Sequence, residues 1–185
     1  KDSTCCLALV RAQCPEVPAV YICAECEFPE QILFLHAIHD CRWFAAAEPF
    51  LQVLARYDLS QDRVEKATMQ AMVWEPVPRL IAQYGFDGMC YGLRIEENPQ
   101  TRGRHLQSRG PIFRYKRDGV LACAPLMDWS YNDVWAFIVS RNLQYCGVYD
   151  KLWDAPEDMQ RLSYWGGETR RRWGRYAWLK HTYPV

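Results

Sequence analysis

The hydrophobic positions near the start of the chain repeat with the period of a helix. The pattern runs from Cys5 to about Cys14, and Pro15 and Pro18 end it. A short β-branched and aromatic run, AVYICA (19–24), follows and predicts a buried strand. The chain therefore opens with a predicted helix and a predicted strand.

The next segment, CEFPEQILFLHAI (26–38), predicts a second helix. Pro29 suits the first helical position, and Glu30 favours the positive end of the helix dipole. Residues 43–57 and 61–84 also have a helical pattern. Two prolines, at positions 76 and 78, are expected to kink or break the second of these stretches.

Two further apolar runs predict strands in the second half of the chain. They are FDGMCYGLRI (86–95) and GVLACAPL (119–126), and the second leads into the predicted helix of DWSYNDVWAFIVSRN (128–142). Ser130 and Asp133 have the spacing of a capping box at the start of this helix, with Asp in place of the usual Glu. Strands that alternate with helices predict an α/β fold, a three-layer α/β/α arrangement around an open, mainly parallel sheet.

Composition places the chain among globular proteins. The 185 residues are 50% hydrophobic and include eight tryptophans, and no run reaches the roughly 18 apolar residues of a membrane span. Nine cysteines, an odd number, lie mostly within apolar runs, which suits buried thiols in a reducing compartment better than a disulfide framework. We therefore expect a cytoplasmic protein with no membrane segment.

The formal net charge of zero hides an uneven distribution. Residues 1–100 carry 8 basic and 14 acidic residues, so residues 101–185 carry the reverse excess. The densest basic segment, TRGRHLQSRGPIFRYKR (101–117), indicates either a solvated charged face or a site for an anion such as a phosphate-rich ligand or nucleic acid.

The polar start KDST (1–4) has two interpretations. Asp2 or Ser3 could simply cap the first helix. Alternatively, the unpaired N–H groups and positive end of the helix bind an anion, with Lys1 adding charge, Ser3 and Thr4 adding hydroxyl donors, and Asp2 holding a magnesium ion.

Further polar side chains follow the predicted strands. In an open parallel sheet the ligand crevice lies beyond the carboxyl ends of the strands, which makes these residues site candidates. They are Glu25, Glu27, Arg94, Glu96, Glu97, Arg102 and Asp128.

Five motifs, taken together, give the chain a family resemblance. They are KDST (1–4), EFPE (27–30), GLRIEEN (92–98), PLMDWSYNDVW (125–135) and YDKLW (149–153). In this order they resemble motifs of the phosphoadenosine phosphosulfate (PAPS) reductases, within the PP-loop or adenine nucleotide alpha hydrolase superfamily. The resemblance implies a Rossmann-like nucleotide-binding domain over residues 1–153 and a C-terminal helical extension over 154–185. It also implies that a strand and an S-G-G turn precede Lys1.

The resemblance implies a binding site for an adenine nucleotide (PAPS, adenylyl sulfate or ATP). Arg94 and Arg102 would act on the phosphosulfate or polyphosphate group as the catalytic residues, although an ion pair of Arg94 with Glu96 or Glu97 is the alternative. The remaining nucleotide-binding candidates are Lys1, Asp2, Ser3, Thr4, Glu27, Glu97 and Tyr149, with Asp2 also a candidate magnesium ligand.

The chain departs from the family pattern in its cysteines. The reductases use a thiolate in an E-C-G-L-H motif that a thioredoxin-like reductant restores, whereas the last cysteine here is Cys146, so we expect the motif either beyond Val185 or absent. The pairs Cys5–Cys6 and Cys23–Cys26 do not have the placement of iron–sulfur ligands.

Three functions therefore stay open. The first is a PAPS reductase-like enzyme with a thioredoxin-like partner. The second is a magnesium-dependent ATP pyrophosphatase or adenylyl transferase in sulfur modification of nucleic acid, and the third is a non-catalytic nucleotide-binding module. The tail GGETRRRWGRYAWLKHTYPV (166–185) could bind nucleic acid or pack as a helix, and a homo-oligomer is an open alternative.

Overall fold

The structure is a computed structural model that describes residues 1–25, 27–38, 40–56, 63–115 and 119–152. Cys26, Trp153 of the YDKLW motif and the basic tail lie outside the described residues. The chain forms two compact units. The first contains residues 1–19 and 84–146, and the second contains residues 20–83 and the residues from 147 onward.

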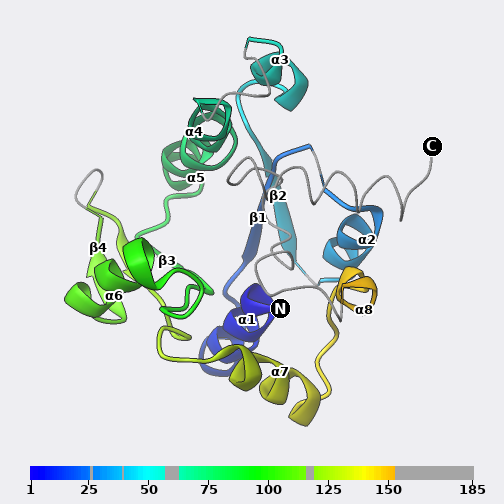
Figure 1. Ribbon diagram of the computed structural model, residues 1–185, viewed down its shortest axis with the longest axis vertical. Helices are drawn as coiled ribbons and strands as arrows, with labels where there is room; N and C mark the ends of the chain where they lie inside the picture. Colours follow the sequence, from blue (N-terminus) through cyan, green and yellow to red (C-terminus); the bar gives the residue numbers. More distant parts are fainter. Residues whose placement is uncertain (26, 39, 57–62, 116–118, 153–185) are drawn as a thin grey trace. The chain divides into compact units, whose positions relative to one another are not determined.

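The first unit combines a small sheet with helices (Figure 1). Its elements are α1 (Asp2–Gln13), β3 (Gly88–Cys90), η2 (Pro99–Gly103, a π-helix), α6 (Arg104–Arg109), β4 (Ile112–Arg114), β5 (Leu121–Cys123) and α7 (Tyr131–Ser140). The strands lie in the order β3-β5-β4, with β3 parallel and β4 antiparallel to β5. This sheet is therefore mixed, and both predicted strands are shorter than the apolar runs 86–95 and 119–126.

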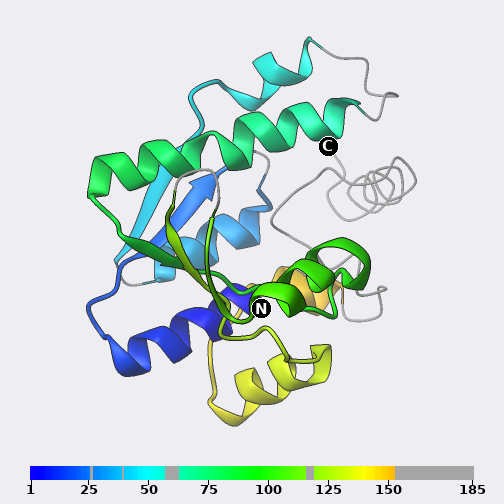
Figure 2. The same ribbon diagram turned by 90° about the vertical axis from the view of Figure 1, so that its left-hand side faces the viewer.

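The basic segment 101–117 is partly structured rather than a plain charged loop. Its described residues contribute the end of η2, all of α6 and the edge strand β4 (Figure 2). Leu106 of α6 and Phe113 of β4 are buried with Ala122 and Ala124, which follows from one apolar residue facing the core from each element. The described arginines of the segment therefore lie on a scaffold with its own small core.

The packing of α1 against α7 forms the other core of the first unit. Cys5 and Cys6 of α1 are buried against Leu126, Val134 and Ile138. The two cysteines behave here as small apolar side chains, which confirms the expectation of buried thiols at these positions.

The start of α7 has the predicted capping box. The Ser130 side chain accepts a hydrogen bond from the Asp133 backbone N–H at 3.1 Å, and the Asp133 carboxylate accepts one from the Ser130 backbone N–H at 2.8 Å. These bonds satisfy two donors that a helix start leaves unpaired, so Asp replaces Glu in this motif without loss of the reciprocal contact.

The second unit begins with a strand–helix–strand segment. Its elements are β1 (Ala19–Cys23), α2 (Pro29–Ala37), β2 (Cys41–Ala45), α3 (Phe50–Leu54), α4 (Arg63–Met69), η1 (Gln70–Trp74, a π-helix), α5 (Pro76–Tyr84) and α8 (Val148–Lys151). The strand at 19–23 and the helix that begins at Pro29 are confirmed. The prediction of a helix from residue 43 is wrong, because residues 43–45 belong to β2, which pairs with β1.

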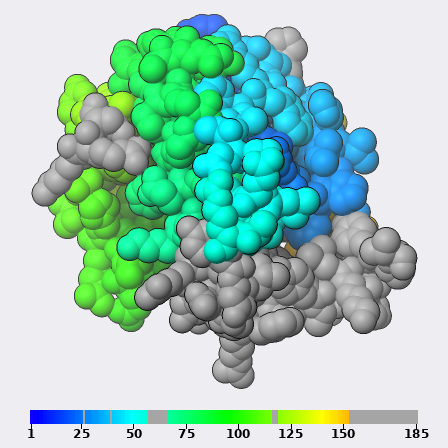
Figure 3. All heavy atoms as spheres, turned by 90° about the horizontal axis from the view of Figure 1, so that it is seen from above, coloured from blue at the N-terminus to red at the C-terminus, as the bar shows by residue number. Residues whose placement is uncertain are grey.

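The stretch 61–84 is helical over its described part, and its helix type changes near the prolines, from the π-helix η1 to the α-helix α5. Pro76 is the first residue of α5 and Pro78 the third. In the first turn of a helix the backbone N–H groups have no intrahelical acceptor, so a proline there costs no hydrogen bond. Glu75, the one residue between η1 and α5, keeps helical φ and ψ angles of −65° and −44°. The chain therefore changes helix type at the prolines, and the predicted kink or break stays a prediction. Much of the face seen in Figure 3 is made by these helices together with α3.

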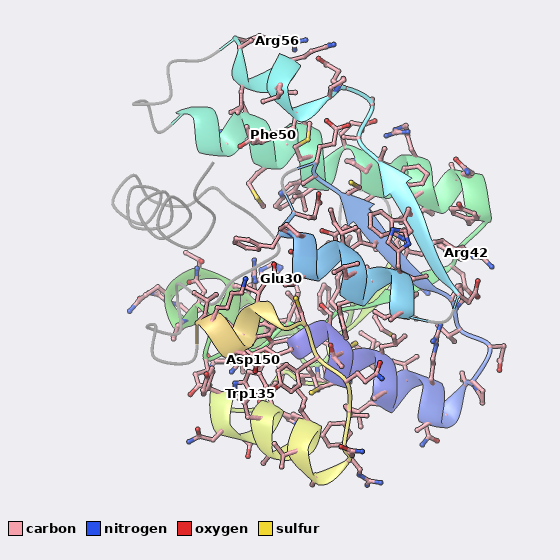
Figure 4. All side chains as sticks on the ribbon, turned by 90° about the vertical axis from the view of Figure 1, so that its right-hand side faces the viewer. Glu30, Arg42, Phe50, Arg56, Trp135 and Asp150 are labelled. Carbon is pink, nitrogen blue, oxygen red and sulfur yellow. The ribbon has the colours of Figure 1, made fainter. Side chains whose placement is uncertain are left out.

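Two sets of contacts hold the second unit together. Met72 of η1 is fully buried against Ala24, Phe50 and Val53. On the other side of the unit α2 lies next to α8, as the labelled side chains of Glu30 and Asp150 show in Figure 4. Lys151 of α8 donates to the Glu30 carboxylate across this contact.

Candidate functional site

The first turn of α1 is the centre of the candidate site. Lys1 is the N-cap residue, and within the described part of the chain no side chain caps this helix start. The structure thus does not bear out the interpretation of Asp2 or Ser3 as a simple cap. A helix of 12 residues carries a partial positive charge at this end, and its first N–H groups lack intrahelical partners.

A buried arginine lies against this helix start. The side chain of Arg94 is 0% exposed, and its Nε donates to Asp2 Oδ1 at 2.6 Å while Nη1 donates to Glu96 Oε2 at 2.7 Å. The Trp129 carbonyl accepts a longer bond from Nη1 at 3.4 Å. The sequence left Arg94 either as a ligand-binding residue or as the partner of Glu96 or Glu97 in an ion pair. The ion pair with Glu96 is present, but Asp2 also pairs with Arg94 and the guanidinium is buried rather than on the surface.

Gly92 explains how the segment that carries Arg94 comes so close to α1. A Cβ atom at position 92 would lie 2.7 Å from the backbone carbon of Asp2 and 2.9 Å from the backbone nitrogen of Ser3. Only glycine permits this approach, because backbone atoms cannot move aside as the end of a side chain can. The glycine of the GLR motif therefore places Arg94 beside the helix start.

The start of α7 contributes to the same cluster. The Tyr131 backbone N–H donates to the Glu96 carboxylate, and Lys1 Nζ lies 5.0 Å from the centre of the Tyr131 ring. Lys1 also donates to Asp2 Oδ2 at 2.9 Å. Two helix starts, two carboxylates and the cationic side chains of Lys1 and Arg94 therefore meet in one cluster.

The charges of the cluster shift the ionisation of its members. Burial alone raises the pKa of Asp2, but the neighbouring Lys1 and Arg94 outweigh it and hold the pKa below its ordinary value. Burial raises the pKa of Cys5, in the second turn of α1, to about 11. Asp2 is therefore a carboxylate at neutral pH, and Cys5 is a neutral thiol that is poorly suited to act as a nucleophile.

Four other predicted site residues, Arg102, Glu97, Ser3 and Thr4, also belong to the first unit. Arg102 is 45% exposed, and its Nη1 lies 3.6 Å from a carboxylate oxygen of Glu97. Ser3 is exposed and Thr4 is half-buried on the first turn of α1. The structure thus brings Lys1, Asp2 and Arg94 into direct contact, and it joins Arg102 to Glu97 as a separate pair.

Two predicted residues belong to the second unit. Glu27 accepts hydrogen bonds from the Ala24 backbone N–H at 2.6 Å and from the Tyr21 hydroxyl at 2.9 Å. Its carboxylate therefore stabilises the end of β1. Glu25 between them has a left-handed φ of 59°, and its carboxylate accepts from the Phe50 N–H at 2.8 Å. Tyr149 is buried in α8.

The donor set does not fit a magnesium site. Among the described residues no group of three or more His, Cys, Asp or Glu side chains could hold a metal ion. Both carboxylate oxygens of Asp2 already accept bonds from cationic side chains. We therefore derive no step through a metal, and the role of Asp2 as a magnesium ligand stays a prediction.

Two residues of the cluster, Gly92 and Tyr131, were absent from the predicted site, whereas Glu96 was among the candidates. Gly92 lies inside the GLRIEEN motif, so the motif itself contained the signal for it. Tyr131 contributes a backbone N–H and a ring face, for which the sequence has no local signal.

Within the described residues no helix is long and apolar enough to span a bilayer.

The fold and the cluster define an α/β protein of the Rossmann-like class with a candidate anion site at a helix start. A solved structure of the PAPS reductase from Candida auris, in a phosphate complex, is similar to it with a TM-score of 0.59 and 16% identity. That match covers 80% of this chain and 72% of the solved chain, and at this identity it establishes the fold alone.

The sequence establishes the family. Residues 1–155 match the model of the phosphoadenosine phosphosulfate reductase domain, and the chain belongs to this family. A phosphoadenosine 5'-phosphosulfate reductase from Gloeobacter violaceus is 35% identical over 77 residues, 42% of this chain. The match spans 29% of the length of that relative.

Proposed function

We propose that this chain is a PAPS reductase-like protein that binds an adenine sulfonucleotide, with the phosphosulfate group at the start of α1 beside Arg94. The observation that carries the proposal is the wholly buried Arg94 guanidinium held against that helix start, in a chain of the PAPS reductase domain family. A planar guanidinium and unpaired helix N–H groups are both suited to sulfate and phosphate oxygens.

For a ligand to reach Arg94, one of the carboxylates that pair with it must move away. Its guanidinium is closed off by two carboxylates, of which Glu96 is 47% exposed and Asp2 is 15% exposed. The half-exposed Glu96 carboxylate loses less interaction energy on moving into water than the more buried Asp2 carboxylate does. Glu96 is therefore the partner that the anion replaces. Asp2 keeps Arg94 oriented, and Lys1 adds positive charge next to it.

Reduction of the bound group requires a thiolate and a dithiol reductant. In the family pattern the thiolate attacks the sulfate sulfur, adenosine bisphosphate leaves, and a thioredoxin-like dithiol then releases sulfite and takes up the oxidation as a disulfide. Residues 1–185 contain no E-C-G-L-H motif. Binding and turnover are therefore tested separately.

The binding test is calorimetric titration of the full chain with PAPS, adenylyl sulfate and ATP, each without added metal. We expect tighter binding of the sulfonucleotides than of ATP. Glu96→Gln is expected to tighten binding, because it removes a competing charge and keeps the shape of the side chain. Arg94→Lys keeps the charge but loses the bidentate geometry and is expected to weaken binding at least about tenfold.

Arg104→Ala is the matched control, since Arg104 is an exposed arginine of the same unit whose side chain donates to Gln100. Equal loss of binding in Arg104→Ala and Arg94→Lys, or unchanged binding in Arg94→Lys with native circular dichroism, would contradict the proposed site.

The turnover test combines PAPS with reduced thioredoxin, and sulfite is the expected product. Release of AMP and pyrophosphate from ATP and magnesium would instead support a pyrophosphatase or adenylyl transferase.

A further inference from the structure

Two cysteines occupy directly opposed positions on neighbouring strands of the first unit. Cys90 of β3 and Cys123 of β5 are register partners in the parallel pair. Residues opposed in this way project their side chains from the same face of a sheet. The register therefore brings two thiols together that lie 33 positions apart in the sequence.

The face that carries these thiols is the one turned away from the α6 core. Ala122 and Phe113, which alternate with the residues of the thiol face, are buried with Leu106. Cys90 is exposed, and Cys123 is partly exposed. A small oxidant in solution can therefore reach at least the Cys90 sulfur.

The spacing of the two strands suits a covalent bond. Paired strands lie about 4.8 Å apart, within the range of roughly 4.4–6.8 Å between the Cα atoms of disulfide-bonded cysteines. Burial raises the pKa of Cys90, and the adjacent Cys123 thiol raises it further. This effect of Cys123 on Cys90 agrees with a short separation between the two sulfur atoms.

We propose that Cys90 and Cys123 are a reversible dithiol–disulfide pair that a low-molecular-weight disulfide, such as oxidised glutathione, oxidises. The Cys90 thiolate attacks one glutathione sulfur, and a glutathione thiolate leaves. The Cys123 thiolate then attacks the Cys90 sulfur of the mixed disulfide and releases the second glutathione. The protein loses two thiol protons and two electrons, and one oxidised glutathione becomes two reduced molecules.

The bond would fix the β3–β5 register just before the segment that leads to Gly92. This inference is independent of the proposed function, because neither cysteine belongs to the Arg94 cluster. Two other thiols could compete with Cys123 for a bond to Cys90. Cys6 interacts electrostatically with both members of the pair, and Cys14 interacts with Cys90.

The test is disulfide mapping of the full native chain after equilibration with oxidised and reduced glutathione at several ratios. Samples are quenched in acid, alkylated and digested, and the linked peptides are identified by mass spectrometry. We expect a peptide that joins Cys90 to Cys123, its loss in Cys90→Ser and in Cys123→Ser, and its retention in Cys14→Ser and Cys6→Ser. Unfolding in guanidinium chloride before oxidation should remove the preference for this pair.

Two results would overturn the proposal. One is a native chain in which Cys90 is linked to Cys6 or Cys14 in place of Cys123. The other is a native chain in which Cys90 accumulates as a stable glutathione adduct with Cys123 still free to alkylate.

Discussion

Replacement of Gly92 by alanine tests how closely the GLR segment packs on α1. The new Cβ would lie 2.7 Å from the backbone carbon and 2.8 Å from the backbone oxygen of Asp2, whereas ordinary contact begins at 3.4 Å. Overpacking of this kind costs about 1–3 kcal/mol. The lower entropy of the unfolded alanine chain offsets about 0.4–1 kcal/mol of this.

From the middle of these two ranges, the net expectation is a loss of about 1–2 kcal/mol in the free energy of unfolding. For a chain of this size, that corresponds to a fall in Tm of about 2–8 °C. Because Asp2 must move away with the helix start, its 2.6 Å bond to Arg94 should also lengthen, and PAPS binding should weaken in the same variant.

The assay is thermal and urea unfolding followed by circular dichroism. Gly147→Ala is the matched control, because a Cβ there has its nearest neighbour, a carboxylate oxygen of Asp150, 4.0 Å away and the φ angle of Gly147 is −63°. If Gly92→Ala unfolds within about 0.5 kcal/mol of both the wild type and this control, the close approach does not exist as described.

Three further predictions concern caps, acid and thiols. Ser130→Ala should lower the free energy of unfolding by about 1 kcal/mol in urea titrations, because the Asp133 N–H loses its partner. Since the pKa of Asp2 is lowered on folding, its contribution to stability is present above the unfolded pKa and is lost as pH falls through the folded pKa; a pH series of urea unfolding should therefore show less acid sensitivity in Asp2→Asn. With a pKa raised to about 11, Cys5 should react with iodoacetamide at pH 8 at least about 100-fold more slowly than the exposed Cys14, as measured by peptide mass spectrometry.

Local signals in the sequence predicted some elements well. The capping box at Ser130 and the proline at position 29 both depend on contacts within one helical turn, so the residues themselves specify them. Residues 43–45 show the opposite case. Their apolar pattern suits a helix, but pairing with β1 makes them a strand, and that pairing depends on residues about 20 positions earlier.

The edge strand β4 was missed for a related reason. Ile112–Arg114 is too short to give a period, and it lies inside a segment whose arginines dominate its composition. Its antiparallel pairing with β5, in which Phe113 lies opposite Ala122, makes it a strand. This one antiparallel edge makes the β3-β5-β4 sheet mixed, while the pairing of β3 with β5 is parallel, as the alternation of strands and helices predicted.

The Arg94 cluster shows why residue types identify a candidate site better than they identify roles. A phosphate-binding arginine, a cap and an ion pair use the same kinds of side chain, and only the fold decides between them. Here one wholly buried guanidinium, two carboxylates and Lys1 balance in charge without a ligand. An anion at this place must displace a carboxylate or leave excess negative charge near a buried site, which is unfavourable. The half-exposed Glu96, next to Arg94, thereby becomes the residue that decides how readily Arg94 can meet a ligand.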